Sequence, residues 1–213
     1  MLQWTSAFRN SWRGPGAQED AACEQASPGM ARALERILHR QPSPEILDLG
    51  QACGATAVYL AGRGARVSVE EFEPPSAGPV IHDASRIPDV GRLRLDQPDE
   101  KFDLVLAWEH FDFVPPDRLD EFVSEIWRVM AEDAWLLLFA LDGSPSPRSQ
   151  GCSASYRVTA DDRLVREPGR GPLRPRWSHH NRAIHQALAP LSVASVTLRR
   201  NRIREFLIHK PAH

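Results

Sequence analysis

The sequence of 213 residues has little cysteine and no long apolar run. Its three cysteines, Cys23, Cys53 and Cys152, lie far apart, which excludes the disulfide framework of a small secreted domain and the ligand spacing of a zinc site. The longest apolar run, residues 134–141, is too short to cross a membrane, and residues 1–10 lack the apolar core of a secretory signal. We therefore expect a cytoplasmic protein with no metal and no membrane partner.

Charge is distributed unevenly along the chain. Residues 1–144 carry 13 basic and 24 acidic side chains, whereas residues 145–213 carry 13 and 4. A basic half can indicate a nucleic-acid partner, but these arginines are dispersed and no aromatic residues alternate with them. The pattern favours the alternative, in which basic C-terminal strands pack against an acidic N-terminal half.

One stretch, residues 45–71, organises the sequence. Residues 46–49 are a short apolar run that predicts a buried parallel strand, and residues 50–55 are small and predict a tight turn. Residues 56–61 have helical spacing, and residues 66–69 predict a second strand that two glutamates follow at once. Strand, turn, helix, strand and acid in this order form the first half of a nucleotide-binding crossover.

The turn and the acid have residue types that suit a bound nucleotide. Gly50 lets the chain reverse at the end of the strand, and the small residues Ala52 and Gly54 keep side chains away from a ligand that faces the helix N-terminus. Glu70 lies 20 positions after Gly50, where a carboxylate can accept hydrogen bonds from both hydroxyls of a ribose. The alternative is an ordinary turn followed by a solvated acid.

Asp48 separates two classes of nucleotide-binding protein. The G-x-G-x-x-G pattern of nicotinamide enzymes is poorly matched, because its positions hold Gly50, Ala52 and Ala55. A carboxylate two residues before the first glycine suits a cationic ligand better than a pyrophosphate. With Gly54 after it, this stretch resembles motif I of the class I S-adenosylmethionine-dependent methyltransferases, apolar-apolar-Asp-x-Gly-x-Gly-x-Gly, although Ala52 replaces the middle glycine.

The resemblance extends over about residues 30–141 and is to small, single-domain bacterial members of that family. It implies a Rossmann-like α/β sandwich of three layers, with a seven-stranded, mostly parallel sheet and an antiparallel C-terminal strand. It also implies S-adenosyl-L-methionine as the cofactor, and no metal. The residues that would hold the cofactor are Asp48, Gly50, Ala52, Gly54, Glu70 and Asp96.

In the family, Asp48 and the glycine-rich turn would hold the methionine end, Glu70 the ribose and Asp96 the adenine. Asp83 competes with Asp96 for the adenine. Asp96 leaves a longer connection after Glu70 for a parallel crossover, but the shorter connection to Asp83 is still long enough.

The remaining elements follow the order that this family implies. We predict helices over residues 30–40, 116–130 and 178–188, and strands over residues 92–95, 102–108, 134–141, 193–198 and 202–209. Residues 1–28 form an N-terminal segment in which Trp4, Phe8 and Trp12 share one helix face, either as a lid on the substrate or as a segment docked on the core. The methyltransferase domain would cover residues 29–213, with an insertion at about 144–176 that contains a hairpin of residues 155–159 and 163–166.

Glu109 and His110 follow the strand 102–108, at the edge where ligands bind in open α/β sheets. They are the candidate catalytic residues, for substrate orientation or for general base catalysis by His110. The alternative is a polar strand end that contacts the next helix. The loop lacks the Asn/Asp-Pro-Pro-Tyr pattern of amino-directed DNA methyltransferases, and we expect no DNA partner.

We therefore interpret the chain as an S-adenosylmethionine-dependent methyltransferase that acts on a small-molecule acceptor. Two alternatives stay open. The altered motif I and the irregular segment before the third strand also fit a non-catalytic cofactor-binding module of the same fold. An NAD(P)-dependent oxidoreductase is disfavoured by Asp48 and by the missing second glycine.

Overall fold

The computed structural model describes residues 23–72, 93–142, 149–170, 174–189, 191–199 and 202–212. The predicted N-terminal lid lies outside these residues, since Trp4, Phe8 and Trp12 precede residue 23. No helix in these ranges is long and apolar enough to span a membrane.

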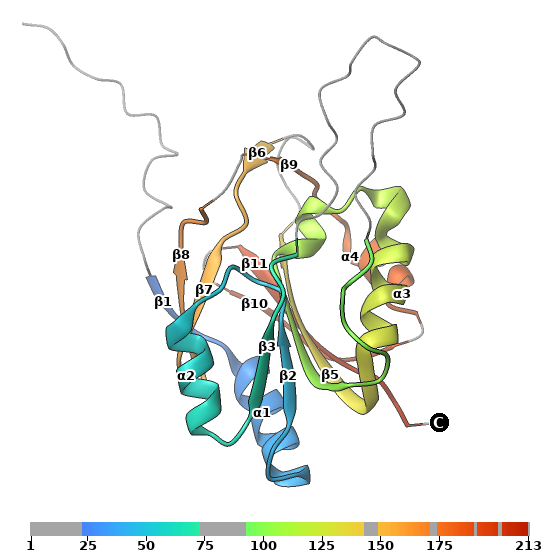
Figure 1. Ribbon diagram of the computed structural model, residues 1–213. Coiled ribbons are helices and arrows are strands. Elements are labelled where there is room, and N and C mark those ends of the chain that lie inside the picture. Colours follow the sequence, from blue (N-terminus) through green and yellow to red (C-terminus); the bar gives the residue numbers. More distant parts are fainter. Residues whose placement is uncertain are drawn as a thin grey trace, which may run out of the picture.

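A six-stranded mixed sheet forms the centre of the molecule, with the strand order β10-β11-β5-β4-β2-β3 (Figure 1). The first four strands in chain order are parallel to one another, β11 pairs antiparallel with β5, and β10 pairs antiparallel with β11. The predicted antiparallel C-terminal strand is confirmed as β11. The strands are β2 (Glu45–Asp48), β3 (Arg66–Val69), β4 (Phe102–Trp108), β5 (Met130–Leu141), β10 (Ser192–Leu198) and β11 (Ile203–His209).

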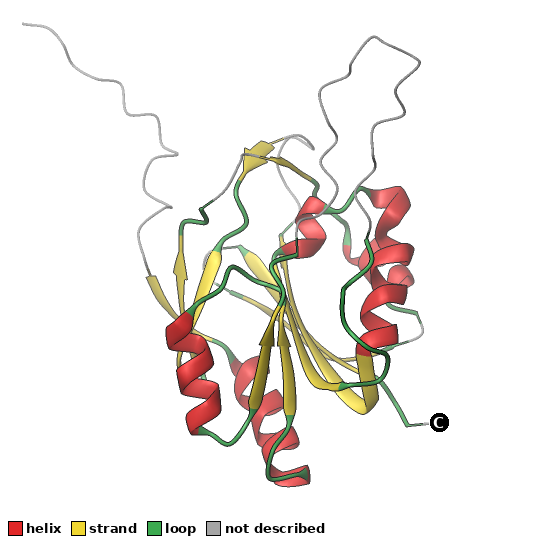
Figure 2. Ribbon diagram, in the orientation of Figure 1, coloured by secondary structure: helices red, strands yellow, loops and turns green. Residues whose placement is uncertain are grey.

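Helices cover both faces of this sheet and produce three layers (Figure 2). α1 (Pro28–Arg40) and α2 (Gly54–Gly62) pack on one face, and α3 (Leu119–Val129) and α4 (Asn181–Ala187) pack on the other. Two short 3-10 helices, η1 (His110–Phe113) and η2 (Pro116–Arg118), connect β4 to α3. The helices predicted from apolar spacing are confirmed, with ends that differ by a few residues.

α1 shows why these sequences fold as helices. The hydroxyl of Ser27 accepts a hydrogen bond from the N–H of Met30 at 3.4 Å, and Pro28 occupies the first turn, where it has no N–H to leave unpaired. One face of the helix is buried and the opposite face is exposed, as its apolar spacing requires. The buried residues are Gly29, Met30, Ala33, Leu34 and Ile37.

The prediction of a seventh strand at residues 92–95 is wrong for its described part. Residues 93–95 join no sheet, although Leu93 and Leu95 are buried against the α3 side of the core. The N–H of Leu95 donates to Oε1 of Glu125 at 2.8 Å, so a side chain on α3 replaces the partner that a neighbouring strand would supply.

The insertion after β5 contains the predicted hairpin, formed by β7 (Ser155–Ala160) and β8 (Arg163–Glu167). β1 (Cys23–Ala26), in the N-terminal segment for which we predicted no strand, extends it to a three-stranded antiparallel sheet by pairing with β8. A second ribbon joins β6 (Ser149–Gly151) to β9 (Arg174–Arg176). The hairpin lies beside α2 (Figure 1), where the Thr56 hydroxyl accepts a hydrogen bond from the N–H of Val158 at 3.1 Å.

Candidate functional site

The carboxyl ends of the parallel strands bring several sequence-predicted residues to one edge of the sheet. Asp48 ends β2, Glu70 follows β3, and Glu109 follows β4. The N–H of Glu70 donates to the carbonyl of Asp48 at 2.9 Å, so the ends of β2 and β3 are in direct contact. This edge is the usual ligand side of an open α/β sheet.

Asp48 is buried and accepts two hydrogen bonds. One comes from the N–H of Gly50 at 2.9 Å and the other from the indole Nε1 of Trp108 at 2.6 Å. Burial raises the pKa of Asp48 to about 6, and the two hydrogen bonds oppose that rise. A Cβ at position 50 would lie 2.7 Å from the Trp108 ring, so the position needs glycine because of a neighbouring side chain.

The start of α2 is open. Gly54 and Ala52 are exposed, and a Cβ added at Gly54 would meet no atom within 4 Å. Cys53, at the N-cap position, makes no side-chain hydrogen bond to the helix, so its side chain satisfies none of the first N–H groups. Such an N-terminus offers hydrogen-bond donors to a ligand above it.

Glu70 and Asp96 lie together, as their predicted roles require. The N–H of Asp96 donates to Oε1 of Glu70 at 2.8 Å, while the residue Asp96 itself is exposed. The other oxygen of Glu70, Oε2, is buried and has no hydrogen-bond partner within the described residues. A buried carboxylate oxygen without a donor is costly, and a ligand hydroxyl would satisfy it. Asp83, the alternative to Asp96, lies outside the described residues.

Glu109 lies in the interior, within a network of donors from the insertion. It accepts hydrogen bonds from Arg166 Nε at 2.8 Å, from Arg176 Nη2 at 2.6 Å and from the hydroxyl of Tyr156. Burial alone would raise the pKa of Glu109, but Arg176 and Arg166 outweigh it and lower the value to about 2. A carboxylate held in this way stays ionised and is poorly suited to accept a proton.

His110 is buried as well, and its Nδ1 lies 2.5 Å from the carbonyl of Ala107. Burial lowers the pKa of His110, which favours the neutral imidazole. Its ring packs near that of Phe72, with 5.6 Å between centroids. The contacts of Glu109 and His110 favour structural roles, and their predicted catalytic roles find no support in this geometry.

Sequence reasoning missed the aromatic residues at this edge. Trp108 has a φ of 40°, a left-handed conformation that is strained for a bulky residue. Its indole stacks on the ring of Tyr156, with centroids 4.8 Å apart and an angle of 7°, and Phe139 packs against both rings. No local pattern marks these three residues, because they come from β4, β7 and β5.

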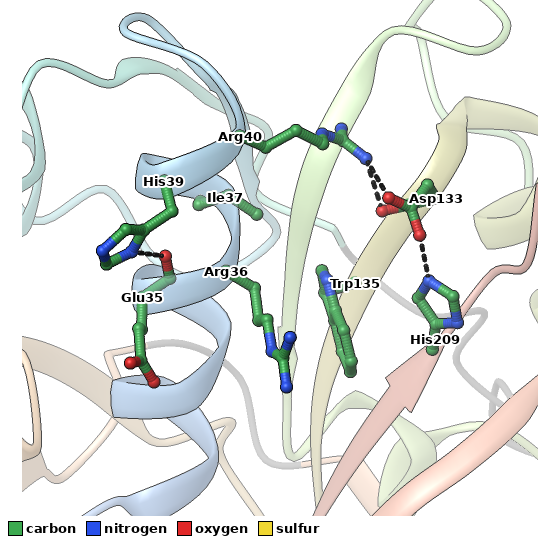
Figure 3. A pocket seen from close by; sticks show the side chains of 8 residues that line it. All are labelled: Glu35, Arg36, Ile37, His39, Arg40, Asp133, Trp135 and His209. Atoms are coloured by element: carbon green, nitrogen blue, oxygen red, sulfur yellow. Dashed lines mark hydrogen bonds and ion pairs between the residues drawn. The ribbon is translucent and has the colours of Figure 1, made fainter.

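A separate cavity of about 730 Å³ lies at the opposite edge of the sheet, beside the end of α1 (Figure 3). Asp133 links its walls, since it accepts a hydrogen bond from Arg40 Nη1 at 3.1 Å and lies 2.6 Å from Nε2 of His209. The basic residues at this helix end complement the partial negative charge of its last carbonyls. The cavity lies away from the ligand side of the parallel strands, and we assign it no role in the chemistry.

Comparison with known proteins decides between the nucleotide-binding classes. Residues 47–138 match the model of a methyltransferase domain family. This part of the chain therefore carries a methyltransferase domain. The match agrees with the resemblance found in motif I, which lies at the start of the matched residues. No curated protein matches the chain.

Solved structures show the same Rossmann-like fold. An S-adenosylmethionine-dependent methyltransferase from Mesorhizobium loti is 14% identical, with a TM-score of 0.52, and the match covers 85% of this chain and 97% of that one. One from Methanosarcina mazei is 15% identical, with a TM-score of 0.50, and covers 83% and 98%. The [4+2]-cyclase SpnF is 11% identical, with a TM-score of 0.50, and covers 86% and 81%. At these identities the likeness concerns the fold.

Proposed function

We propose that this protein transfers the methyl group of S-adenosyl-L-methionine to a small-molecule acceptor at the carboxyl edge of β2, β3 and β4. The observation that carries this assignment is the unpartnered Oε2 of Glu70, buried beside the backbone of Asp96. Together with the open start of α2, these residues fit a ligand that has the two hydroxyls of a ribose and also a cationic end. The arginines of the C-terminal half that bind Glu109 and Asp112 face inward, which gives no support to a nucleic-acid surface.

Each predicted residue has a defined part in this proposal. Glu70 would accept hydrogen bonds from the ribose hydroxyls, and Asp96 would face the adenine. Asp48 would hold the cationic methionine end, and the backbone of Gly50, Ala52 and Gly54 would allow close approach. The sulfonium of the cofactor supplies an electrophilic methyl group, so the protein contributes mainly positioning and the exclusion of water. The domain of residues 29–213 would carry all of these groups.

A second candidate function is a reaction other than methyl transfer on the same fold. Two observations favour it. Asp48 is already bonded to the Trp108 indole, and SpnF, which shares the fold, is described as a cyclase. Binding of the cofactor product is common to both candidates, whereas release of that product from S-adenosyl-L-methionine in the presence of an acceptor is expected only for the first.

Replacing Glu70 by alanine is expected to weaken binding of S-adenosylhomocysteine at least roughly tenfold, because a charge-assisted hydrogen bond contributes about 1.5–3 kcal/mol. Glu71→Ala is the matched control, since Glu71 is the next residue and is exposed. Titration calorimetry measures both affinities. Equal losses in the two variants, or a larger loss for Glu71→Ala, would show that the ribose has been assigned to the wrong residue.

A further inference from the structure

Arg199, directly after β10, is a buried cation whose nitrogens lack hydrogen-bond partners. Its side chain is 4% exposed, and its Nε, Nη1 and Nη2 atoms are all buried without a hydrogen bond in the described part of the chain. A guanidinium carries five N–H donors and is costly to bury with none of them satisfied. Burial accordingly lowers the pKa of Arg199.

The nearby carboxylate of Glu205 does not satisfy Arg199. Oε2 of Glu205 lies 3.7 Å from Nη1, which is too far for a hydrogen bond. That oxygen already accepts the hydroxyl of Ser27 at 2.9 Å, and Oε1 accepts the N–H of Gly29 at the start of α1. Glu205 therefore balances the charge of Arg199 and leaves its donors unused.

The buried cations Lys210 and Arg204, also among the described residues, have hydrogen-bond partners, unlike Arg199. Nζ of Lys210 donates to the carbonyls of Trp127 and Met130 at 3.1 and 2.7 Å. Arg204 donates to the carbonyl of His179 at 2.8 Å, as well as to Asn181 and Leu141. An arginine is favoured where a planar, two-donor fork is needed, and the usual partner of that fork is a carboxylate or a phosphate.

Arg199 lies at the cofactor edge of the sheet. Its N–H donates to the carbonyl of Ile203 at 2.8 Å, and Ile203 pairs with Leu141 at the carboxyl end of β5. The guanidinium lies 4.8 Å from the ring centroid of Phe139. Phe139 packs against Trp108, whose indole donates to Asp48. One aromatic layer thus connects Arg199 with the acid assigned to the cofactor.

We propose that Arg199 binds an oxyanion group, a carboxylate or a phosphate, of the methyl acceptor. The inference rests on the proposed function and narrows the acceptor to an anionic small molecule. The anion would use the donors that Glu205 leaves free, and the rings of Phe139 and Tyr156 would lie beside the rest of the molecule.

Thermal unfolding with simple anions tests this assignment without the true acceptor. Benzoate and phenyl phosphate are compared with neutral benzamide at constant ionic strength. At ten times its dissociation constant, a bound anion is expected to raise the melting temperature of the wild-type protein by about 3–6 °C. Benzamide should leave the melting temperature unchanged. The anion that causes the larger rise identifies the oxyanion as a carboxylate or a phosphate.

Three variants locate the effect. Arg199→Met should abolish the response, and without ligand it should melt at a lower temperature, because it leaves the buried carboxylate of Glu205 without its counter-charge. Arg199→Lys keeps the charge but loses the planar fork, and should lose most of the response. Arg157→Met is the control, since Arg157 lies on the same hairpin as Tyr156 and forms a half-exposed pair with Glu167. It should respond like the wild type.

The proposal is overturned if neither anion raises the melting temperature of the wild-type protein, or if Arg199→Met responds equally. Calorimetry with S-adenosylhomocysteine on the same proteins separates this failure from failure of the proposed function. Wild type and Arg199→Met should bind it alike. If the wild type binds it but neither anion, the acceptor assignment alone fails, whereas absence of its binding refutes the methyltransferase proposal as well.

Discussion

Replacing Glu109 by alanine is expected to lower the free energy of unfolding by roughly 3–5 kcal/mol, because the change leaves buried guanidinium groups without their shared carboxylate. Arg166 and Arg176 both bind Glu109, and their side chains are only 19% and 12% exposed. Urea denaturation at neutral pH measures the loss. The pKa of Glu109 is lowered from 4.5 to about 2, so its contribution is present above about pH 4.5 and is lost as the pH falls through about 2.

Glu167→Ala is the matched control for Glu109→Ala. Glu167 lies on the same hairpin as Arg166 and pairs with Arg157 at 3.3 Å, but both side chains of this pair are about 40% exposed. Its loss should cost less than about 1 kcal/mol. If Glu109→Ala unfolds like the wild type and loses only methyl transfer, Glu109 is a catalytic residue and its assignment to a structural role is wrong.

Replacing Asp48 by asparagine is expected to stabilise the free protein and weaken cofactor binding. Burial raises the pKa of Asp48 from 3.8 to about 6, which corresponds to an order-of-magnitude cost of about 2–3 kcal/mol for the ionised form in the folded state. An amide keeps the shape and an oxygen that can accept from Gly50 and Trp108. At pH 7.5 the variant should therefore unfold at higher urea concentration, while its affinity for S-adenosylmethionine should fall about tenfold or more.

The extra stability expected for Asp48→Asn should depend on pH in a defined direction. Because the folded-state pKa of Asp48 is raised, the folded wild type takes up a proton as the pH falls through about 6, and its stability increases down to about pH 4. The advantage of Asp48→Asn should be full above pH 6 and vanish near pH 4. Asp120→Asn, an exposed control on α3, should change neither the stability to urea nor the affinity for S-adenosylmethionine. A loss of stability for Asp48→Asn at pH 7.5 would contradict the assigned cost of its charge.

Local patterns were sufficient for the first strand-helix-strand unit of the central sheet. The strand, turn, helix and strand of residues 45–71 follow from apolar runs, small residues and glycines that lie next to one another in the chain. The alternation of Leu93 and Leu95 predicted their burial but not their hydrogen bonds, because the acceptor for Leu95 is the side chain of Glu125, far along the chain. The same alternating pattern of apolar residues arises whether the backbone N–H groups bond to a neighbouring strand or to a side chain.

The candidate site was predictable only where it depends on chain order. Glu70 and Asp96 follow predicted strands whose carboxyl ends would share an edge, and the structure brings them into contact. Glu109 also follows a strand, but its environment is set by arginines from the insertion, which no spacing near Glu109 reveals. The uneven charge of the two halves did predict this outcome in general terms, since basic C-terminal residues pair with acidic residues of the first half.

The most direct measurement is titration calorimetry of the wild-type protein with S-adenosylhomocysteine and, separately, with NAD. Asp48, the open start of α2 and the unpartnered oxygen of Glu70 predict saturable binding of S-adenosylhomocysteine at a single site and no binding of NAD under the same conditions. Heat released by NAD alone, with none from S-adenosylhomocysteine, would contradict the assignment of this edge of the sheet to the methyl-donor cofactor.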